Sequence, residues 1–138
     1  MDFSELGSFD SCSFDCVTAL DVIEHIKKAK RLRLLENMER IAKKRIVVFT
    51  PNGFLPQSAH NNNPLQIHKS GWKVKEMRNL GYKVIGINGL RTLRGDYATI
   101  RFKPTQFWEK VSEVTQYFVR NHPKYAFQML CVKSNHNK

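Results

Sequence analysis

The feature that most constrains the fold is a regular alternation of strand-like and helix-like segments. Four short runs rich in β-branched, aromatic and other apolar residues predict strands at 14–20, 45–50, 82–87 and 125–133. Between them, apolar residues recur at three- and four-residue spacing, which predicts helices over about 22–44, from Ser70 to Leu80, and after Pro104. This alternation predicts an α/β domain with a mostly parallel sheet and flanking helices. The last strand follows a different kind of connection, so an antiparallel orientation is open to it.

The length of 138 residues fits one domain, which we assign to residues 1–138, with a frayed tail at 134–138. No apolar run approaches the roughly 20 residues that a membrane-spanning helix needs. The N-terminus also lacks the basic and then apolar pattern of a signal peptide. We therefore expect a cytoplasmic protein without a membrane partner.

The chain is strongly basic, with 23 Lys and Arg against 12 Asp and Glu and a formal net charge of +11. Such a charge attracts anions, nucleic acid among them, and says nothing about the fold. Within the first predicted helix, five basic residues lie close together at 27–33: Lys27, Lys28, Lys30, Arg31 and Arg33. This face can hold phosphates, but an ordinary solvated surface explains it more simply.

Cysteines and histidines give no metal signature. Cys12, Cys16 and Cys131 are odd in number, which argues against a closed disulfide framework. We expect all three to be reduced and structural, with Cys16 and Cys131 inside apolar runs. His60 and His68 flank an Asn-rich loop, but their spacing fits no strong ligand pattern. The prediction is therefore no metal site.

Polar residues follow the first two strands, at the edge where open α/β sheets bind ligands. Asp21 and Glu24 are three residues apart, so they can share one face of the first helical turn, with His25 next to them. The positive end of a helix favours carboxylates, which can accept hydrogen bonds from a ligand. The structural alternative is that Asp21 caps the helix and His25 lies on the surface. The second strand ends in Thr-Pro-Asn-Gly, which offers Asn52 at the same edge or forms an ordinary turn.

These residues, in this order, resemble a known family. The stretch SFDCVTALDVIEH at 13–25 looks like the corresponding stretch of class I S-adenosylmethionine-dependent methyltransferases, and IVVFTPNG at 46–53 resembles their next strand and its end. The segments HKSGW at 68–72 and LGYKV at 80–84 are similar to the helix and strand that follow. The resemblance is nearest to the small methyltransferase-domain subfamily and covers nearly the whole chain.

The resemblance implies a cofactor, S-adenosylmethionine, and residues that would bind it. The chain would begin near the end of the family's third strand, where Asp2, with Phe3 beside it, would contact adenine. Ala19, Leu20 and Asp21 would lie near the methionine and the ribose. The family's Gly-rich turn and its ribose-binding carboxylate would both be missing from this chain.

The resemblance also implies residues on the side of the methyl acceptor. Glu24 and His25 would be the catalytic residues, with His25 as the candidate base for an acceptor that must lose a proton. Asn52, His68 and Trp72 would form part of the acceptor pocket. In some relatives an acidic residue followed three positions later by Glu-His binds a divalent metal or helps the acceptor, and here an Asp stands at that first position.

The family fold has seven strands with the last one antiparallel, and this chain resembles strands four to seven. The expected spatial order is therefore first, second, fourth and third, with the fourth strand antiparallel to its neighbours. Each missing hydrogen bond to the cofactor is worth roughly 1–3 kcal/mol, so we expect the isolated chain to bind S-adenosylmethionine weakly or not at all. The first strand would be an exposed sheet edge, which predicts self-association or a separate chain that supplies the missing strands.

The leading functional prediction is methyl transfer to an acceptor that the sequence does not name. This chain would be a truncated form that lacks the Gly-rich cofactor motif, and it need not be active alone. One alternative is a non-catalytic basic module that binds nucleic acid through the helix face at 27–33. Another is an inactive methyltransferase relic with an interaction role. Cofactor titration separates the first from both others.

Overall fold

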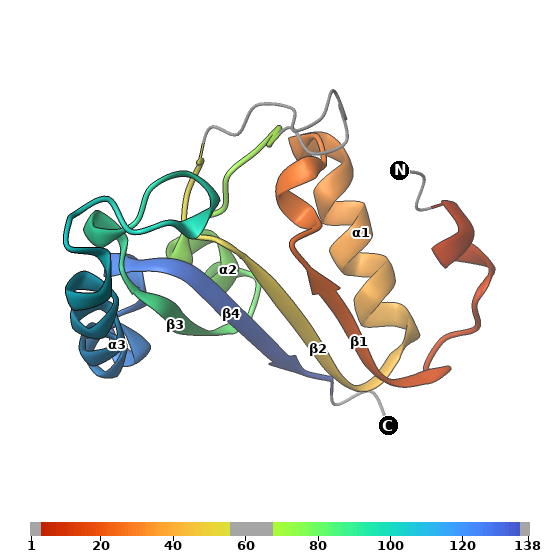
Figure 1. Cartoon of the computed structure of the whole chain (residues 1–138). Helices are drawn as coiled ribbons and strands as arrows, with labels where there is room; N and C mark the ends of the chain where they lie inside the picture. The colour runs from red at the N-terminus through yellow and green to blue at the C-terminus, as the bar shows by residue number, and fades with distance from the viewer. Residues whose placement is uncertain (1–3, 56–67, 136–138) are drawn as a thin grey trace.

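The computed structural model describes residues 4–55 and 68–135, so Asp2, Phe3 and His60 lie outside the described residues. Four strands form one sheet: β1 (Phe14–Leu20), β2 (Ala42–Pro51), β3 (Lys83–Leu90) and β4 (Ala126–Ser134). Three α-helices accompany them: α1 (Lys28–Ile41), α2 (Val74–Asn79) and α3 (Thr105–Asn121) (Figure 1). No helix within these ranges is long and apolar enough to cross a membrane.

The strand order confirms the expected topology. The sheet runs β1-β2-β4-β3, with β1 parallel to β2 and β4 antiparallel to both β2 and β3. Because β1 and β2 are parallel and paired up to Leu20 and Phe49, their carboxyl ends meet at one edge of the sheet. The loops after these two strands therefore lie side by side, and that juxtaposition builds the candidate site.

The core lies on one face of the sheet, under α1 and α2. A row of side chains in register across all four strands is buried there, consisting of Ala19, Val48, Cys131 and Val84. Met38 of α1 and Met77 of α2 belong to the same buried cluster. The row on the opposite face is Leu20, Phe49, Leu130 and Ile85, and each of these side chains keeps contact with solvent.

The largely apolar run at 14–20 is typical of a strand covered on both faces, but β1 is exposed along most of its length. Among its seven residues only Ala19 is buried, and Leu20 is 58% exposed. Cys16, expected within an apolar interior, is also exposed, whereas Cys131 is buried. The reason is position in the sheet, because β1 is an edge strand with one covered face.

The helix expected over about 22–44 is interrupted and ends earlier. A 3₁₀ turn covers Ile23–His25, the chain is extended at Ile26 and Lys27, and the α-helix occupies only Lys28–Ile41. β2 then begins at Ala42, before the expected residue 45. The break has a tertiary cause. Lys69 and Ser70 donate hydrogen bonds to the carbonyl oxygens of residues 24 and 26, which a continuous helix would use for its own hydrogen bonds.

Arg31 does not belong to a solvated basic face. It is buried, its guanidinium lies 4.0 Å from the centre of the Trp72 ring, and it forms an ion pair of 3.3 Å with Glu76. It also donates a hydrogen bond of 3.1 Å to the carbonyl oxygen of Gly71. Arg31 therefore fastens α1 to the segment that leads into α2, while Lys27, Lys30 and Arg33 remain exposed.

Several boundaries differ in smaller ways. The piece expected to be extended at 97–102 contains a 3₁₀ turn at Asp96–Ala98 and a single bridge between Arg94 and Ile100. Ser70 does not cap α2, whose N-cap is Lys73. At the C-terminus, Ser134 belongs to β4 and the Asn135 amide donates to the carbonyl oxygen of Lys44 at 2.8 Å.

The apolar stripe of α3 does not face the sheet. Phe107, Val114 and Phe118 are exposed, and the buried residues of this helix are Ser112 and Val119. Its inner side instead bonds to the backbone along the outer edge of β3. The Gln116 amide donates to the carbonyl of Gly86 and accepts from the N–H of Gly89, and the Thr115 hydroxyl accepts from the N–H of Leu90. The helix thus covers this edge of the sheet, which is one way proteins protect edge strands.

Candidate functional site

The candidate site begins where β1 ends. Asp21 has a left-handed backbone (φ 50°), a conformation that Asp tolerates better than most residues. Its N–H donates to the carbonyl oxygen of Phe49 at 3.0 Å, which extends the pairing of β1 and β2 by one residue. The chain then enters the 3₁₀ turn Ile23–His25, which carries Glu24 and His25.

Glu24 is a buried carboxyl group, only 2% exposed. Its Oε2 accepts a hydrogen bond of 3.1 Å from the hydroxyl of Thr50, which stands at the end of the neighbouring strand β2. Burial raises the pKa of Glu24 to about 7, and the nearby charge of Asp21 acts in the same direction. Burial also raises the pKa of Asp21, while its hydrogen bond with Glu24 lowers it. Glu24 therefore gains or loses its proton near neutral pH.

The segment before α2 is tied to this turn through the backbone. The N–H groups of Lys69 and Ser70 donate to the carbonyl oxygen of Glu24 at 2.8 and 3.1 Å. The hydroxyl of Ser70 donates to the carbonyl oxygen of Ile26 at 2.9 Å. These bonds bring His68 beside residues more than 40 positions earlier in the chain.

His25 and His68 face each other across the site. Their ring centres are 4.9 Å apart and the rings are inclined by 65°. His68 Nδ1 lies 2.7 Å from the carbonyl oxygen of Leu55, and because a carbonyl only accepts, Nδ1 carries the proton. Burial lowers the pKa of His68, so the ring is neutral at pH 7 and its Nε2 presents a lone pair.

Glu24, His25 and His68 form a potential metal-binding group. Each offers one ligand atom, and these atoms all lie within 4.8 Å of one another. Imidazole and carboxylate ligands together suit divalent transition metals. The spacing of these residues along the chain gave no ligand pattern for this group, because His68 is remote in sequence and only the tertiary structure brings it to the Glu-His pair.

The other predicted site residues fall into two sets. Leu20 is exposed at the carboxyl end of β1, whereas Ala19 is buried beneath α1 and can reach a ligand only through its backbone. Asn52 is buried and its amide donates to three carbonyl oxygens, those of residues 123, 124 and 126, at 2.9, 3.1 and 3.0 Å. Trp72 is 1% exposed beneath Arg31. The side chains of Asn52 and Trp72 are therefore both buried within the described part of the fold.

A comparison with solved structures places this geometry within a known fold. The chain is similar to a SAM-dependent methyltransferase from Archaeoglobus fulgidus, with a TM-score of 0.55 and 16% sequence identity. The match covers 95% of this chain and 63% of that one, so the chain spans less than two thirds of the solved protein's length. No family model and no curated protein matches the sequence. The fold of the described residues thus resembles part of the fold of that protein.

Proposed function

We propose that this chain takes part in S-adenosylmethionine-dependent methyl transfer, that Asp21 lies on the side of the cofactor, and that Glu24, His25 and His68 act on the side of the methyl acceptor. The observation that carries the proposal is the proximity of these side chains at the carboxyl edge of β1 and β2, within a fold similar to that of a SAM-dependent methyltransferase. Ligands of open α/β sheets bind at this edge.

The residues at the end of β1 fit one side of the cofactor. Leu20 presents an exposed apolar side chain, and Asp21 next to it carries a carboxyl group that can accept hydrogen bonds from hydroxyl or amino groups. When bound, S-adenosylmethionine supplies an electrophilic methyl group on a sulfonium. The chain's own contribution is to bind and orient the acceptor, because methyl transfer depends strongly on alignment of the reacting atoms.

Proton transfer is the second contribution of the cluster. An acceptor oxygen or nitrogen that carries a proton must lose it, and a base works best when its pKa lies near the working pH. Glu24, with a pKa of about 7, meets this condition. Burial lowers the pKa of His68, so its neutral ring offers an unprotonated Nε2 that can accept a proton. Burial of Glu24 against Thr50 restricts it to short proton transfers within the cluster. His68 Nε2 and His25 are the groups that can face an acceptor.

A bound divalent cation is a second possibility for the same cluster, favoured by the mutual proximity of the Glu24, His25 and His68 ligand atoms. Such a cation would be held by these three residues, and it would orient an acceptor oxygen and lower its pKa. Cation binding would displace the proton of Glu24, so it is expected to strengthen as the pH rises through about 7.

The test is an NMR titration of the ¹⁵N-labelled chain with S-adenosylmethionine up to millimolar concentration, which detects binding too weak for calorimetry. We expect amide shifts at Leu20, Asp21 and His25, and their loss in Leu20→Arg. Leu32→Arg, at an exposed position on α1, is the matched control. Absence of shifts at millimolar cofactor, or shifts confined to residues away from the carboxyl edge of β1, contradicts the proposal.

A further inference from the structure

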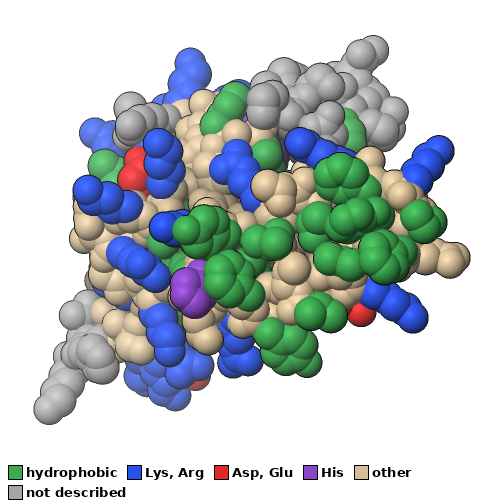
Figure 2. Space-filling model, turned by 90° about the vertical axis from the view of Figure 1, so that its left-hand side faces the viewer, with side chains coloured by type: hydrophobic (Ala, Val, Ile, Leu, Met, Phe, Trp, Pro, Cys, Tyr) green, Lys and Arg blue, Asp and Glu red, His purple; other side chains and the backbone are tan. Residues whose placement is uncertain are grey.

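Exposed aromatic side chains concentrate on α3 and the segments that flank it. They are Phe102, Phe107, Tyr117, Phe118 and Tyr125, and Tyr117 is 82% exposed. Figure 2 shows hydrophobic side chains gathered on the side of the molecule that carries α3, with Lys and Arg around them. We define the α3 surface as these five aromatic residues, Val114 and the basic residues of the same segment, which are Arg101, Lys103, Lys110, Arg120 and Lys124.

Packing explains why these rings face outward. The inner side of α3 is committed to the edge of β3 through Thr115 and Gln116, and its buried positions are Ser112 and Val119. The aromatic residues lie on the other side of the helix and therefore remain exposed. A contiguous exposed apolar surface marks an interaction site more often than scattered exposed apolar residues do.

The rings are arranged partly as stacks. Phe118 and His122 are nearly parallel, inclined by 9° with centres 4.5 Å apart, and Phe118 and Tyr125 are inclined by 29° at 5.9 Å. The ammonium of Lys124 lies 4.6 Å from the centre of the Tyr125 ring. Flat rings combined with cations resemble the platforms on which nucleic-acid bases stack.

The charge of the surface selects an anionic partner. Residues 101–125 contain five basic side chains, Arg101, Lys103, Lys110, Arg120 and Lys124, against two acidic ones, Glu109 and Glu113, for a net charge of +3. The whole chain is at +11, so two copies would repel each other if they met through this surface. A polyanion would be attracted along the same surface.

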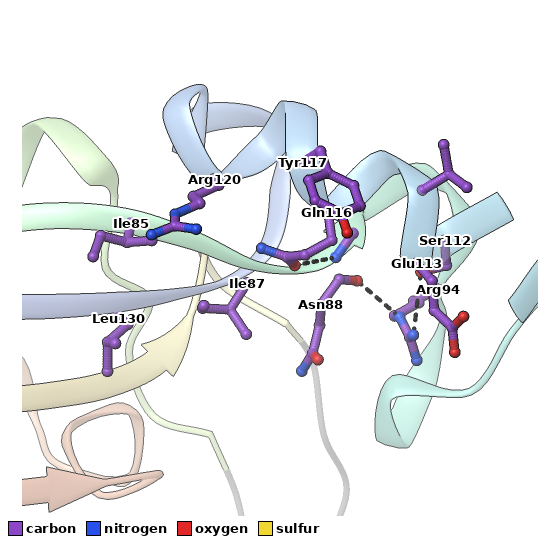
Figure 3. Close-up of a pocket in the computed structure, with 12 residues that line it drawn as sticks. Ile85, Ile87, Asn88, Arg94, Ser112, Glu113, Gln116, Tyr117, Arg120 and Leu130 are labelled. Carbon is purple, nitrogen blue, oxygen red and sulfur yellow. Dashed lines mark hydrogen bonds between the residues drawn. The ribbon is translucent and has the colours of Figure 1, made fainter. Parts of the chain in front are cut away.

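A cavity of about 730 Å³ adjoins the stripe. Its floor consists of Ile85, Ile87 and Leu130 on the open face of the sheet, and Tyr117 and Arg120 project beside it from α3 (Figure 3). This volume lies within the range of small-molecule sites, about 300–1,000 Å³. An apolar floor beside a Tyr and an Arg offers space for a flat base and a charge for its phosphate.

We propose that the α3 surface binds single-stranded nucleic acid, with bases stacked on Tyr117, Phe118 and Tyr125 and phosphates paired with Arg120 and Lys124. This inference does not rest on methyl transfer and differs from the sequence-based expectation, which placed nucleic-acid binding on α1. An anionic membrane is the competing partner. It is less favoured because five of the six large hydrophobic residues exposed in the segment 102–125 are aromatic, and flat rings suit base stacking.

The experiment measures fluorescence anisotropy of labelled oligouridylate and oligodeoxythymidylate of about 15 nucleotides, at about 50 and 200 mM salt. The test variant is Tyr117→Leu with Phe118→Leu, which keeps apolar side chains but removes both rings. Phe9→Leu is the control, since Phe9 is an exposed aromatic residue in the segment before β1. Lys30→Ala with Arg33→Ala removes charge from the exposed side of α1.

We expect oligonucleotide binding that weakens with salt, a loss of at least about tenfold in the Tyr117 and Phe118 variant, and no loss in the Phe9 control. Three results overturn the proposal: equal affinity of the double Leu variant and the wild type, a greater loss in the α1 variant, or binding to phosphatidylserine vesicles without oligonucleotide binding. Circular dichroism of each variant confirms that the fold is retained, and because all five substituted side chains are exposed, the comparison does not depend on core packing.

Discussion

Glu24→Gln should stabilise the fold at alkaline pH and leave it nearly unchanged at acidic pH. Burial holds the pKa of Glu24 at about 7 in the folded chain, against 4.5 when the group is solvated. The folded state therefore binds a proton that the unfolded state releases over this window, and stability falls as the pH rises from about 4.5 to 7. At about 1.4 kcal/mol per pKa unit, the loss amounts to about 3 kcal/mol above pH 7.

Gln has nearly the same shape, carries no charge, and keeps an oxygen that accepts the Thr50 hydroxyl. The substitution therefore removes the cost of a buried negative charge at alkaline pH. At pH 5 the wild-type group is already protonated, so Gln gains little there.

The assay is urea unfolding followed by circular dichroism, with EDTA present so that no cation compensates the charge. At pH 8 we expect the midpoint of Glu24→Gln to exceed that of the wild type by about 1–2 M, from the typical dependence of small domains on urea. At pH 5 the two midpoints should coincide. Glu36→Gln, at an exposed position of α1, should shift neither curve. Destabilisation of Glu24→Gln by the same amount at both pH values would refute the reasoning, because the effect would then come from packing or a lost hydrogen bond.

Three further predictions concern the site and its support. Asn52→Ala removes the side-chain donor to three carbonyl groups, two buried and one part-buried, and should lower the free energy of unfolding by about 2–3 kcal/mol, measured by the same urea assay, and a loss below about 0.5 kcal/mol would contradict this role. Gly86→Ala places a Cβ against the carbonyl oxygen of Val119 and should lower the thermal midpoint, whereas Gly7→Ala meets nothing and should not. Mn²⁺ should broaden the histidine resonances of the site at pH 8 more than at pH 6, and His68→Ala should weaken this effect at least about tenfold; equal broadening in His68→Ala would exclude the proposed ligand group.

Local residue patterns alone predicted the four strands along the chain, whereas their spatial order in the sheet was implied by the family resemblance. β1 begins and ends where the apolar run at 14–20 does, and the turn residues Pro51-Asn52-Gly53 and Gly81 mark the end of β2 and of the segment containing α2. These features depend on the backbone preferences of each residue and on neighbours along the chain. The placement of Asp21, Glu24 and His25 at a sheet edge follows equally, because they directly succeed a strand.

The tertiary structure decided everything that depends on partners distant in sequence. Lys69 and Ser70 bond to the turn at 23–26, which divides the expected helix and carries His68 to Glu24. Because α3 contacts β3 through Gln116, the apolar stripe of this helix faces solvent, although periodicity alone would predict that the stripe is buried. The physical reason is common to these cases: periodicity shows that a helix has an apolar side, but the free energy of packing and of satisfying buried backbone groups decides which side meets the sheet.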